Sequence, residues 1–124
     1  MKISKHFSRE EFDCKDGTEV PDNLMIDLQR LVSALEVIRY ACGGQSITIN
    51  SGYRTKSYNE SIGGASKSKH LEAIAADIVV ENMNPVKVAE RIEKLIRNGH
   101  IPQGGLKAYA TFTHYDIRGT KARW

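Results

Sequence analysis

The stretch Ala75-Ala76-Asp77-Ile78-Val79-Val80 decides how this chain folds, because it is apolar throughout except for one carboxylate. A short apolar run of this kind predicts a strand that is buried on both faces, near the centre of a sheet. A buried aspartate is unfavourable unless it is paired or bound to a metal ion. Asp77 therefore marks the centre of the predicted sheet and is itself a candidate metal ligand.

Two further elements are predicted on the amino-terminal side of this run. Aliphatic residues recur every three or four positions from Leu24 to Ile38, which predicts a helix with one buried face that ends at the Gly43-Gly44 pair. Residues 46–50, with the sequence Ser-Ile-Thr-Ile-Asn, alternate and are rich in β-branched side chains, so they predict a strand. Ser8 fits the N-cap of a short helical turn that follows it.

The segments that flank the run complete the expected fold. Residues 51–68 are rich in glycine, hydroxyl and amide side chains without apolar periodicity, so we expect a long loop there, a kind of segment that is usually functional. Asn84-Pro85 predicts the start of a second helix that stops at Gly99. From Gly104 onward the chain is strand-like. These elements predict a single small α+β domain over residues 1–124, with a mostly antiparallel central sheet and two main helices.

Two histidines accompany Asp77, one at the end of the predicted loop (His70) and one on the last predicted strand (His114). Two imidazoles and a carboxylate form a three-ligand set for zinc that leaves one coordination position open, as in catalytic rather than structural zinc sites. A set without cysteine suits hydrolysis, although other divalent metals could occupy the same atoms. A lone histidine is more often structural, so this hypothesis requires that the last strand lies near Asp77.

Composition and charge bound the class of protein. The chain has 124 residues, of which 40% are hydrophobic and 27% charged, as in an ordinary globular domain. A net charge of +3 is a mild bias toward anionic partners and falls short of the basic stripe typical of nucleic-acid binders. We expect no nucleic-acid partner and no membrane partner, a monomer, and free thiols at Cys14 and Cys42, whose spacing is not that of metal ligands. The amino terminus has no secretory signal, which predicts synthesis in the cytoplasm.

Three ordered motifs carry a resemblance to a known family: Ser51-Gly52-Tyr53-Arg54, then Ser68-Lys69-His70 with Ala75 and Asp77, and finally His114-Tyr115-Asp116. They resemble the D-Ala-D-Ala metallopeptidases, the family of zinc D,D-carboxypeptidases and related peptidoglycan peptidases. The family's signature reads S-G-Y-R, then S-x-H-x-x-G-x-A-x-D, and later H-x-D. His6-Phe7-Ser8 and Glu11-Phe12 match the opening of its small members from phages and bacterial genomes, so the resemblance runs nearly end to end.

The resemblance implies a hedgehog and D-Ala-D-Ala-peptidase-like fold with one zinc ion held by His70, Asp77 and His114. It also implies that Arg54 holds a substrate carboxylate or polarises the scissile carbonyl, for which a planar, permanently charged guanidinium is suited. Ser68 would contact substrate or organise the metal loop. Tyr53 is predicted to bind substrate, although a tyrosine in this place could equally pack against the sheet.

Two positions depart from the family's pattern. The signature glycine after the first histidine is Ala73, a residue that disfavours positive φ. Many members carry an acidic general base three residues before the last histidine, and that position is Thr111. Asp116 is the nearest catalytic substitute, and its competing role is to orient a ligand histidine or to pair with Arg118. Glu72 and His100 are further candidates for the base.

The hypothesis that follows is a zinc metallopeptidase that hydrolyses a peptide bond in the peptidoglycan stem or cross-link, as a carboxypeptidase or as an endopeptidase. Without a secretory signal, we expect a phage or prophage lysin that reaches the cell wall after release. The alternative is a non-catalytic zinc-containing module that binds cell-wall peptides, an idea that Thr111 favours. A nucleic-acid binder is a weaker third possibility that rests on net charge alone.

Overall fold

The computed structural model describes residues 1–124 and contains a four-stranded antiparallel sheet with the strand order β1-β2-β4-β3. Two main helices and one short helix accompany the sheet, so the predicted α+β fold is confirmed. The elements are β1 (Ile47–Ser51), β2 (Ala75–Val80), β3 (Leu106–Ala108), β4 (Thr113–Asp116), α1 (Met25–Ala41), α2 (Lys56–Ser61), α3 (Pro85–Arg97), and the 3-10 turns η1 (Arg9–Phe12), η2 (Asp22–Leu24) and η3 (Lys69–Glu72).

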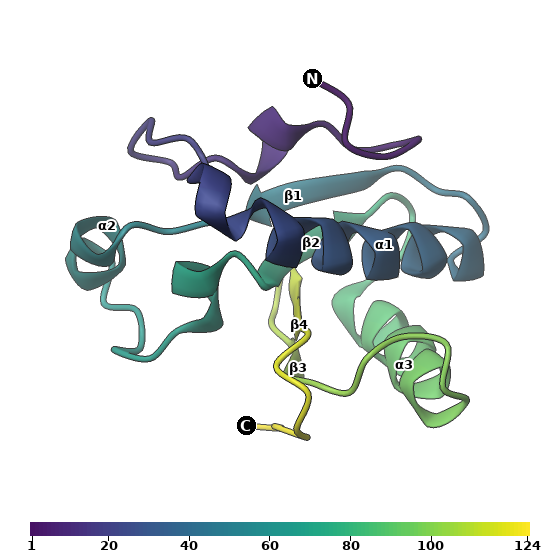
Figure 1. The fold of residues 1–124 in the computed structure, drawn as a ribbon. Helices are drawn as coiled ribbons and strands as arrows, with labels where there is room; N and C mark the ends of the chain where they lie inside the picture. The colour runs from purple at the N-terminus through teal and green to yellow at the C-terminus, as the bar shows by residue number, and fades with distance from the viewer.

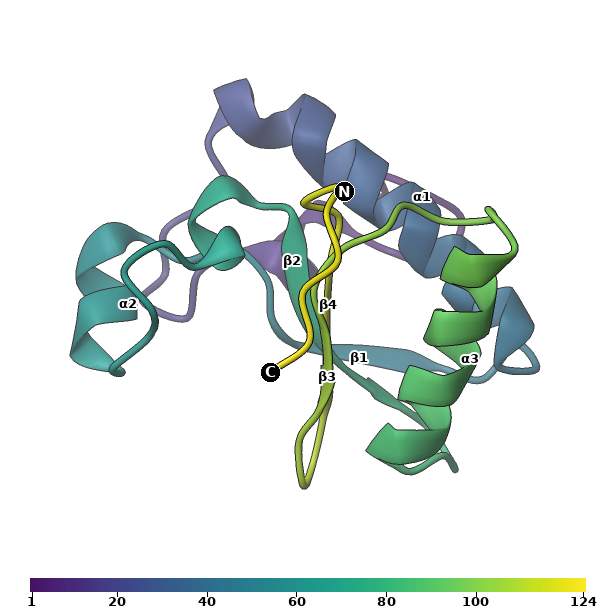
Figure 2. The same ribbon diagram turned by 90° about the horizontal axis from the view of Figure 1, so that it is seen from below.

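Strand β2 occupies the centre of the structure, as its apolar sequence predicts. Ala76, Ile78 and Val80 point into the hydrophobic core, while Asp77 lies on the opposite face of the sheet because successive side chains alternate. In both views of the ribbon, α3 and α2 lie on opposite sides of β2 and β4 (Figures 1 and 2). The face that carries Asp77 is therefore the one beside α2 and η3.

Helix α1 has the buried face that the sequence predicts. Leu28, Leu31 and Leu35 are fully buried, together with Val32 and Ile38. The helix ends at the predicted place, where Gly43 and Gly44 adopt positive φ angles of 79° and 75°. This packing stabilises the 17-residue helix, since most helical stability in proteins comes from the packing of an apolar face.

Helix α3 begins as predicted, because the Asn84 side chain accepts a hydrogen bond of 2.9 Å from the backbone N–H of Lys87 and Pro85 takes the first helical position. Val88, Ile92 and Ile96 form its buried face. The helix is followed by Gly99 with a φ of 75°. Its contacts with β2, β3 and β4 close the core on the side of the sheet opposite Asp77.

Two segments differ from the sequence predictions. Residues 51–68 are not all loop, because α2 lies within them; Thr55 caps this helix by accepting a hydrogen bond from the Tyr58 N–H. Only Asn59 of this helix is buried, so there is no apolar stripe for a sequence pattern to reveal. The segment from Gly104 onward is a hairpin of β3 and β4 rather than one strand, and Phe112 lies in its turn.

Cys14 and Cys42 are both free, as the sequence predicts, and both are buried. The short turn after Ser8 is also present, as η1. None of the helices combines the length and the hydrophobicity that crossing a bilayer requires.

Ala73 adopts the left-handed conformation that the signature glycine would favour, with φ 58° and ψ 31°. The residue ends η3, and its N–H bonds to the carbonyl of His70 before the chain enters β2. A side chain in this region of backbone space costs about 1–2 kcal/mol relative to the ordinary helical region. The chain therefore keeps the left-handed turn of the family's signature glycine, although alanine is strained in that conformation.

We predict that Ala73→Gly changes the free energy of unfolding by less than about 1 kcal/mol, because relief of the left-handed strain offsets the loss of a buried methyl group. The matched control is Ala76→Gly, an equally buried alanine in extended conformation, which should destabilise the protein by about 1–2 kcal/mol. Denaturant unfolding of both variants at one fixed zinc concentration measures the difference. Equal destabilisation would show that Ala73 stores no strain.

Candidate metal centre

The register of two neighbouring strands places Asp77 and His114 side by side. The two residues are direct partners between β2 and β4, so their side chains project from the same face of the sheet. The Nδ1 atom of His114 lies 3.0 Å from Oδ1 of Asp77. The predicted proximity of the last strand to Asp77 is thus confirmed.

His70 reaches the same point from η3, the turn that leads into β2. The Ser68 hydroxyl caps this turn by accepting a hydrogen bond of 3.2 Å from the backbone N–H of His70. The Nε2 atom of His70 lies 3.3 Å from Oδ1 of Asp77, and one donor atom from each of the three residues falls within 4.8 Å of the others. His70, Asp77 and His114 are all buried, so the three predicted ligands converge in one sheltered place.

The proton on each histidine is held on the nitrogen that faces away from this cluster. Nδ1 of His70 lies 2.7 Å from the carbonyl oxygen of Gly52, and Nε2 of His114 lies 2.8 Å from Oδ2 of Asp116. Both partners are acceptors, so both of these nitrogens donate. In the neutral form of each ring, the remaining nitrogen therefore directs a lone pair toward Asp77, the arrangement found around metal-bound histidines; without a metal, a proton on that nitrogen makes the hydrogen bond to Asp77 instead.

The cluster fits a zinc ion. Two imidazole nitrogens and a carboxylate oxygen are the ligands of many catalytic zinc sites, and tetrahedral bonds of about 2.0–2.1 Å place ligand atoms about 3.3 Å apart. The observed separations of 3.0 Å and 3.3 Å are close to that value. Two lone pairs and a carboxylate oxygen in one buried spot repel each other unless a cation or a proton lies among them.

Electrostatics at the cluster favour positive charge. Burial opposes a charge on His114, but the hydrogen bonds to Asp116 and Asp77 outweigh it and raise the pKa of the imidazole. Burial would likewise raise the pKa of Asp77, yet its hydrogen bonds with His114 and His70 hold it well below its usual range. A divalent cation would supply the same positive charge without a proton.

Asp116 supports His114 from behind and is fully buried. Arg118 donates to both carboxylate oxygens, at 2.9 Å and 2.8 Å, and the Gly105 N–H donates to Oδ1 at 2.9 Å. With His114 as a third partner, both oxygens of this carboxylate are already hydrogen-bonded, and Asp116 does not line the cleft described below. The geometry favours the orienting role for Asp116 and argues against the catalytic role that the sequence also allowed.

Two glycines leave the space that Asp116 needs to reach His114 and Arg118, and no sequence pattern assigned them a role. A Cβ atom at Gly104 would lie 1.7 Å from the backbone oxygen of Asp116, and one at Gly105 would lie 2.2 Å from its Oδ2 atom. Gly52 is similarly confined, since a Cβ there would come within 2.8 Å of the Phe12 backbone. In the sequence, the Gly104-Gly105 pair before the hairpin is the feature that could have indicated this close approach to Asp116.

Arg54 lies beside the cluster and is held by three acceptors. Its guanidinium donates to Ser51 at 3.2 Å, to the Asn59 side chain at 3.2 Å, and to Oδ2 of Asp77 at 3.3 Å. Asn59 is almost fully buried and also donates to the carbonyl of Ala65 at 2.8 Å. Asn59 thus ties Arg54 to the loop that follows α2, a role that the sequence analysis did not assign.

A cleft of about 530 Å³ opens over the cluster. Arg54 and Ser68 line it, as expected for residues that contact substrate. Tyr53 is not among the lining residues and packs against the hydrophobic core, the alternative that the sequence left open, so its substrate contact stays a prediction. The lining residues are Arg54, Gly63, Gly64, Ala65, Lys67, Ser68, Lys69, His70, Asp77, Tyr109, Phe112, His114, Arg118 and Trp124.

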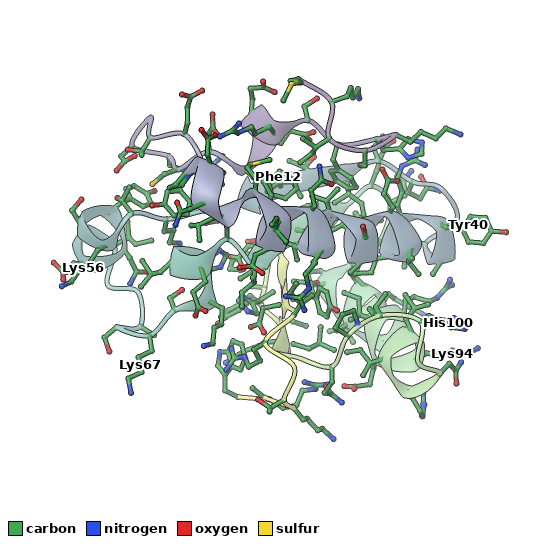
Figure 3. The ribbon with its side chains drawn as sticks, in the orientation of Figure 1. Phe12, Tyr40, Lys56, Lys67, Lys94 and His100 are labelled. Atoms are coloured by element: carbon green, nitrogen blue, oxygen red, sulfur yellow. The ribbon has the colours of Figure 1, made fainter.

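Asp77 is the only carboxylate among the residues that line this cleft. Thr111 lines a separate small pocket with Val80 and Pro85, so the hairpin turns this position away from the metal cluster. Glu72 pairs with Lys69 at 3.1 Å outside the cleft. His100 is exposed beyond the end of α3, near Lys94 and far from the site (Figure 3). None of these three positions offers a general base at the cluster.

Replacing the carboxylate behind His114 should weaken metal binding. We predict that Asp116→Asn lowers zinc affinity about 10- to 100-fold, because an amide cannot satisfy both His114 and the Arg118 guanidinium. Competition with a chelator measures the affinity. The control is Asp27→Asn, which removes charge from another arginine-paired carboxylate, at the start of α1. An unchanged zinc affinity in Asp116→Asn would contradict the orienting role.

Loss of the buried amide should destabilise the loop without disturbing the ligands. We predict that Asn59→Ala lowers the free energy of unfolding by about 1–3 kcal/mol, because the Ala65 carbonyl and the guanidinium lose their partner. Its zinc affinity should stay within about threefold of wild type, since Asn59 contacts none of the three ligands. Asn50→Ala, at an exposed position of β1, should change stability by less than about 0.5 kcal/mol. A large fall in zinc affinity would show that Arg54 and its support belong to the metal centre itself.

Comparisons with known proteins agree with this site. A profile of the peptidase M15 family matches residues 5–116. Over 44 residues the chain is 43% identical to the zinc D-Ala-D-Ala carboxypeptidase of Streptomyces albus G, a stretch that is 36% of this chain and 17% of that protein. The chain thus corresponds to a small part of that longer relative. The match over residues 5–116 includes all three residues of the cluster and confirms the resemblance seen in the motifs. The chain belongs to the peptidase M15 family.

Proposed function

We propose that the protein is a zinc-dependent peptidase that hydrolyses a peptide bond in peptidoglycan stem peptides or cross-links. One observation carries the proposal: His70, Asp77 and His114 turn one donor atom each toward a common point at the floor of a cleft. Membership of the peptidase M15 family supports a peptide as substrate. The name of the Streptomyces albus G relative, a zinc D-Ala-D-Ala carboxypeptidase, supports both zinc and a cell-wall peptide.

The residues around the cluster have distinct tasks in this proposal. When bound, zinc supplies the Lewis acidity that polarises a carbonyl group and activates water. The Gly52 carbonyl and Asp116 keep the histidine protons away from the cleft, so both lone pairs stay available. Arg54 brings a permanent positive charge to the side of Asp77 that faces the cleft.

Arg54 is suited to bind an anionic part of the reacting peptide. Its side chain is mostly buried, and the Ser51 and Asn59 contacts fix the plane of the guanidinium. A rigid, preorganised cation in a sheltered cleft stabilises negative charge more strongly than one in water. It would hold either a terminal carboxylate or a carbonyl oxygen that gains charge during hydrolysis.

A second candidate function is a zinc-containing module that binds cell-wall peptides without cutting them. It is favoured by the absence of any carboxylate other than Asp77 from the lining of the cleft. Hydrolysis usually gains from a general base within hydrogen-bond reach of the attacking water. The two candidates share the metal site and the ligand, and they differ in whether peptide fragments are released.

The experiment combines metal analysis with digestion of purified cell wall. We predict about one zinc ion per wild-type chain and release of soluble peptides that mass spectrometry identifies. His70→Ala and His114→Ala should each lose most of the zinc and lower peptide release more than about 100-fold. His100→Ala, an exposed histidine away from the site, should match wild type in both measurements.

The two candidate functions give different results in the same experiment. If zinc-loaded wild type releases no peptide but sediments with insoluble wall, the binding module is the better account. If wild type takes up no zinc, both candidates fail.

A further inference from the structure

Three aromatic rings form one side of the cleft, and we refer to Tyr109, Phe112 and Trp124 as the aromatic wall. Tyr109 and Phe112, from the hairpin turn, stack with their ring centres 4.6 Å apart and an angle of 18° between the rings. The indole N–H of Trp124 donates a hydrogen bond of 2.9 Å to the Tyr109 hydroxyl. The wall is therefore a connected unit and not three independent side chains.

Trp124 lies directly beside the metal cluster. Its ring centre is 5.1 Å from that of His114, edge to face, and the Arg118 guanidinium lies 5.7 Å from the indole. The residue is 52% exposed and takes no part in the hydrophobic core. An indole that is held by three contacts and yet stays half exposed has apolar surface available for a ligand.

The opposite side of the cleft is polar. Gly63, Gly64 and Lys67 belong to the loop after α2, and Arg54 lies beneath them next to Asp77. The cleft thus has cations and backbone on one side and aromatic rings on the other. Such a cleft suits an extended peptide that has a polar or anionic edge and an apolar edge.

Two cations beside the aromatic wall limit the chemical class of ligand group that it would accept. Lys107 lies 5.1 Å from the centre of the Tyr109 ring, and Arg118 occupies the corresponding place at Trp124. These cations fill the positions where a cationic ligand group would interact with the rings and would repel it. An uncharged aliphatic group is left as the favoured partner.

We propose that the aromatic wall binds the aliphatic side chain of a peptide residue next to the reacting bond. One residue of extended chain spans about 3.3–3.6 Å, so a peptide whose reacting carbonyl lies over the cluster brings a neighbouring side chain within reach of Trp124. The proposal rests on the proposed function, since it assigns the orientation of a peptide in the same cleft. Trp124 is then a residue that sets substrate specificity.

The chain contains a single tryptophan, so fluorescence excited selectively in the indole reports on Trp124. Zinc-loaded protein is mixed with diacetyl-Lys-D-Ala-D-Ala or with diacetyl-Lys-Gly-Gly, and the signal is read within milliseconds, before turnover at ordinary enzymatic rates. Both peptides should change the fluorescence. The D-Ala peptide should bind at least about fourfold more tightly, the effect of burying one methyl group.

Variants test whether Trp124 causes this discrimination, measured as the ratio of kcat/KM for the two peptides, or by calorimetry if neither peptide is cut. Trp124→Ala should reduce the preference for the D-Ala peptide to less than about twofold, whereas Trp124→Phe should keep most of it because the ring remains. Zinc affinity, measured by competition with a chelator, should stay within about threefold in both variants, since Trp124 offers the metal no ligand atom. Tyr40→Ala removes a more exposed aromatic residue at the far end of α1 (Figure 3) and should behave as wild type.

Several results would overturn the proposal. Wild-type fluorescence that does not respond to either peptide, or equal affinity for the two peptides, would show that the wall contacts no aliphatic side chain. A fall of more than about tenfold in zinc affinity in Trp124→Ala would instead make Trp124 a support for His114. If Trp124→Ala fails to fold, the peptide pair on wild type and on Trp124→Phe still decides. If the protein prefers the D-Ala peptide but hydrolyses neither peptide, only the proposed function fails. If it hydrolyses both peptides without a preference, only this inference fails.

Discussion

The pairing of Asp77 with His114 across β2 and β4 is the constraint on which the site depends. Direct cross-strand partners share one face of a sheet, so the register alone brings an acid from the middle of the chain next to an imidazole from its end. A slip of one residue would turn one of the two side chains into the core. The apolar neighbours of Asp77 oppose such a slip, because Ala76, Ile78 and Val80 would then leave the hydrophobic core. The same pattern that packs the core therefore positions the ligands.

The groups that bond to the outer nitrogens of His70 and His114 decide which nitrogen of each ring can bind a metal ion. A backbone carbonyl holds one ring and a buried carboxylate holds the other, so each neutral ring presents to the cluster the nitrogen that can bind a metal ion. Asp116 is itself held by a guanidinium and a backbone N–H. This chain of contacts ends at Arg118, whose positive charge balances the buried carboxylate. The orientation of a metal ligand is thus maintained by residues that never touch the metal position.

Much of this arrangement could be predicted from the sequence, and the failures have physical reasons. The central strand and both main helices follow from apolar periodicity, and the three converging residues follow from the resemblance of the ordered motifs to a known family. Helix α2 could not be predicted in this way, because its only buried residue is Asn59. The role of Asn59 depends on Arg54 and Ala65, partners that meet only in the folded chain. Tyr53 packs against the core and Thr111 lies in the turn between β3 and β4, and apolar periodicity predicts neither position.

The close approach of residues 104 and 105 to Asp116 limits which sequences can carry this site. Any side chain at Gly105 would occupy the space of the Asp116 carboxylate, and any at Gly104 would meet its backbone. The pair should therefore tolerate no substitution across evolution as long as the carboxylate is retained, even where the surrounding loop diverges. In distant sequences, two adjacent glycines upstream of a His-x-Asp tripeptide would then identify chains that keep this supporting carboxylate, and divergence at both places together would mark those that have abandoned it.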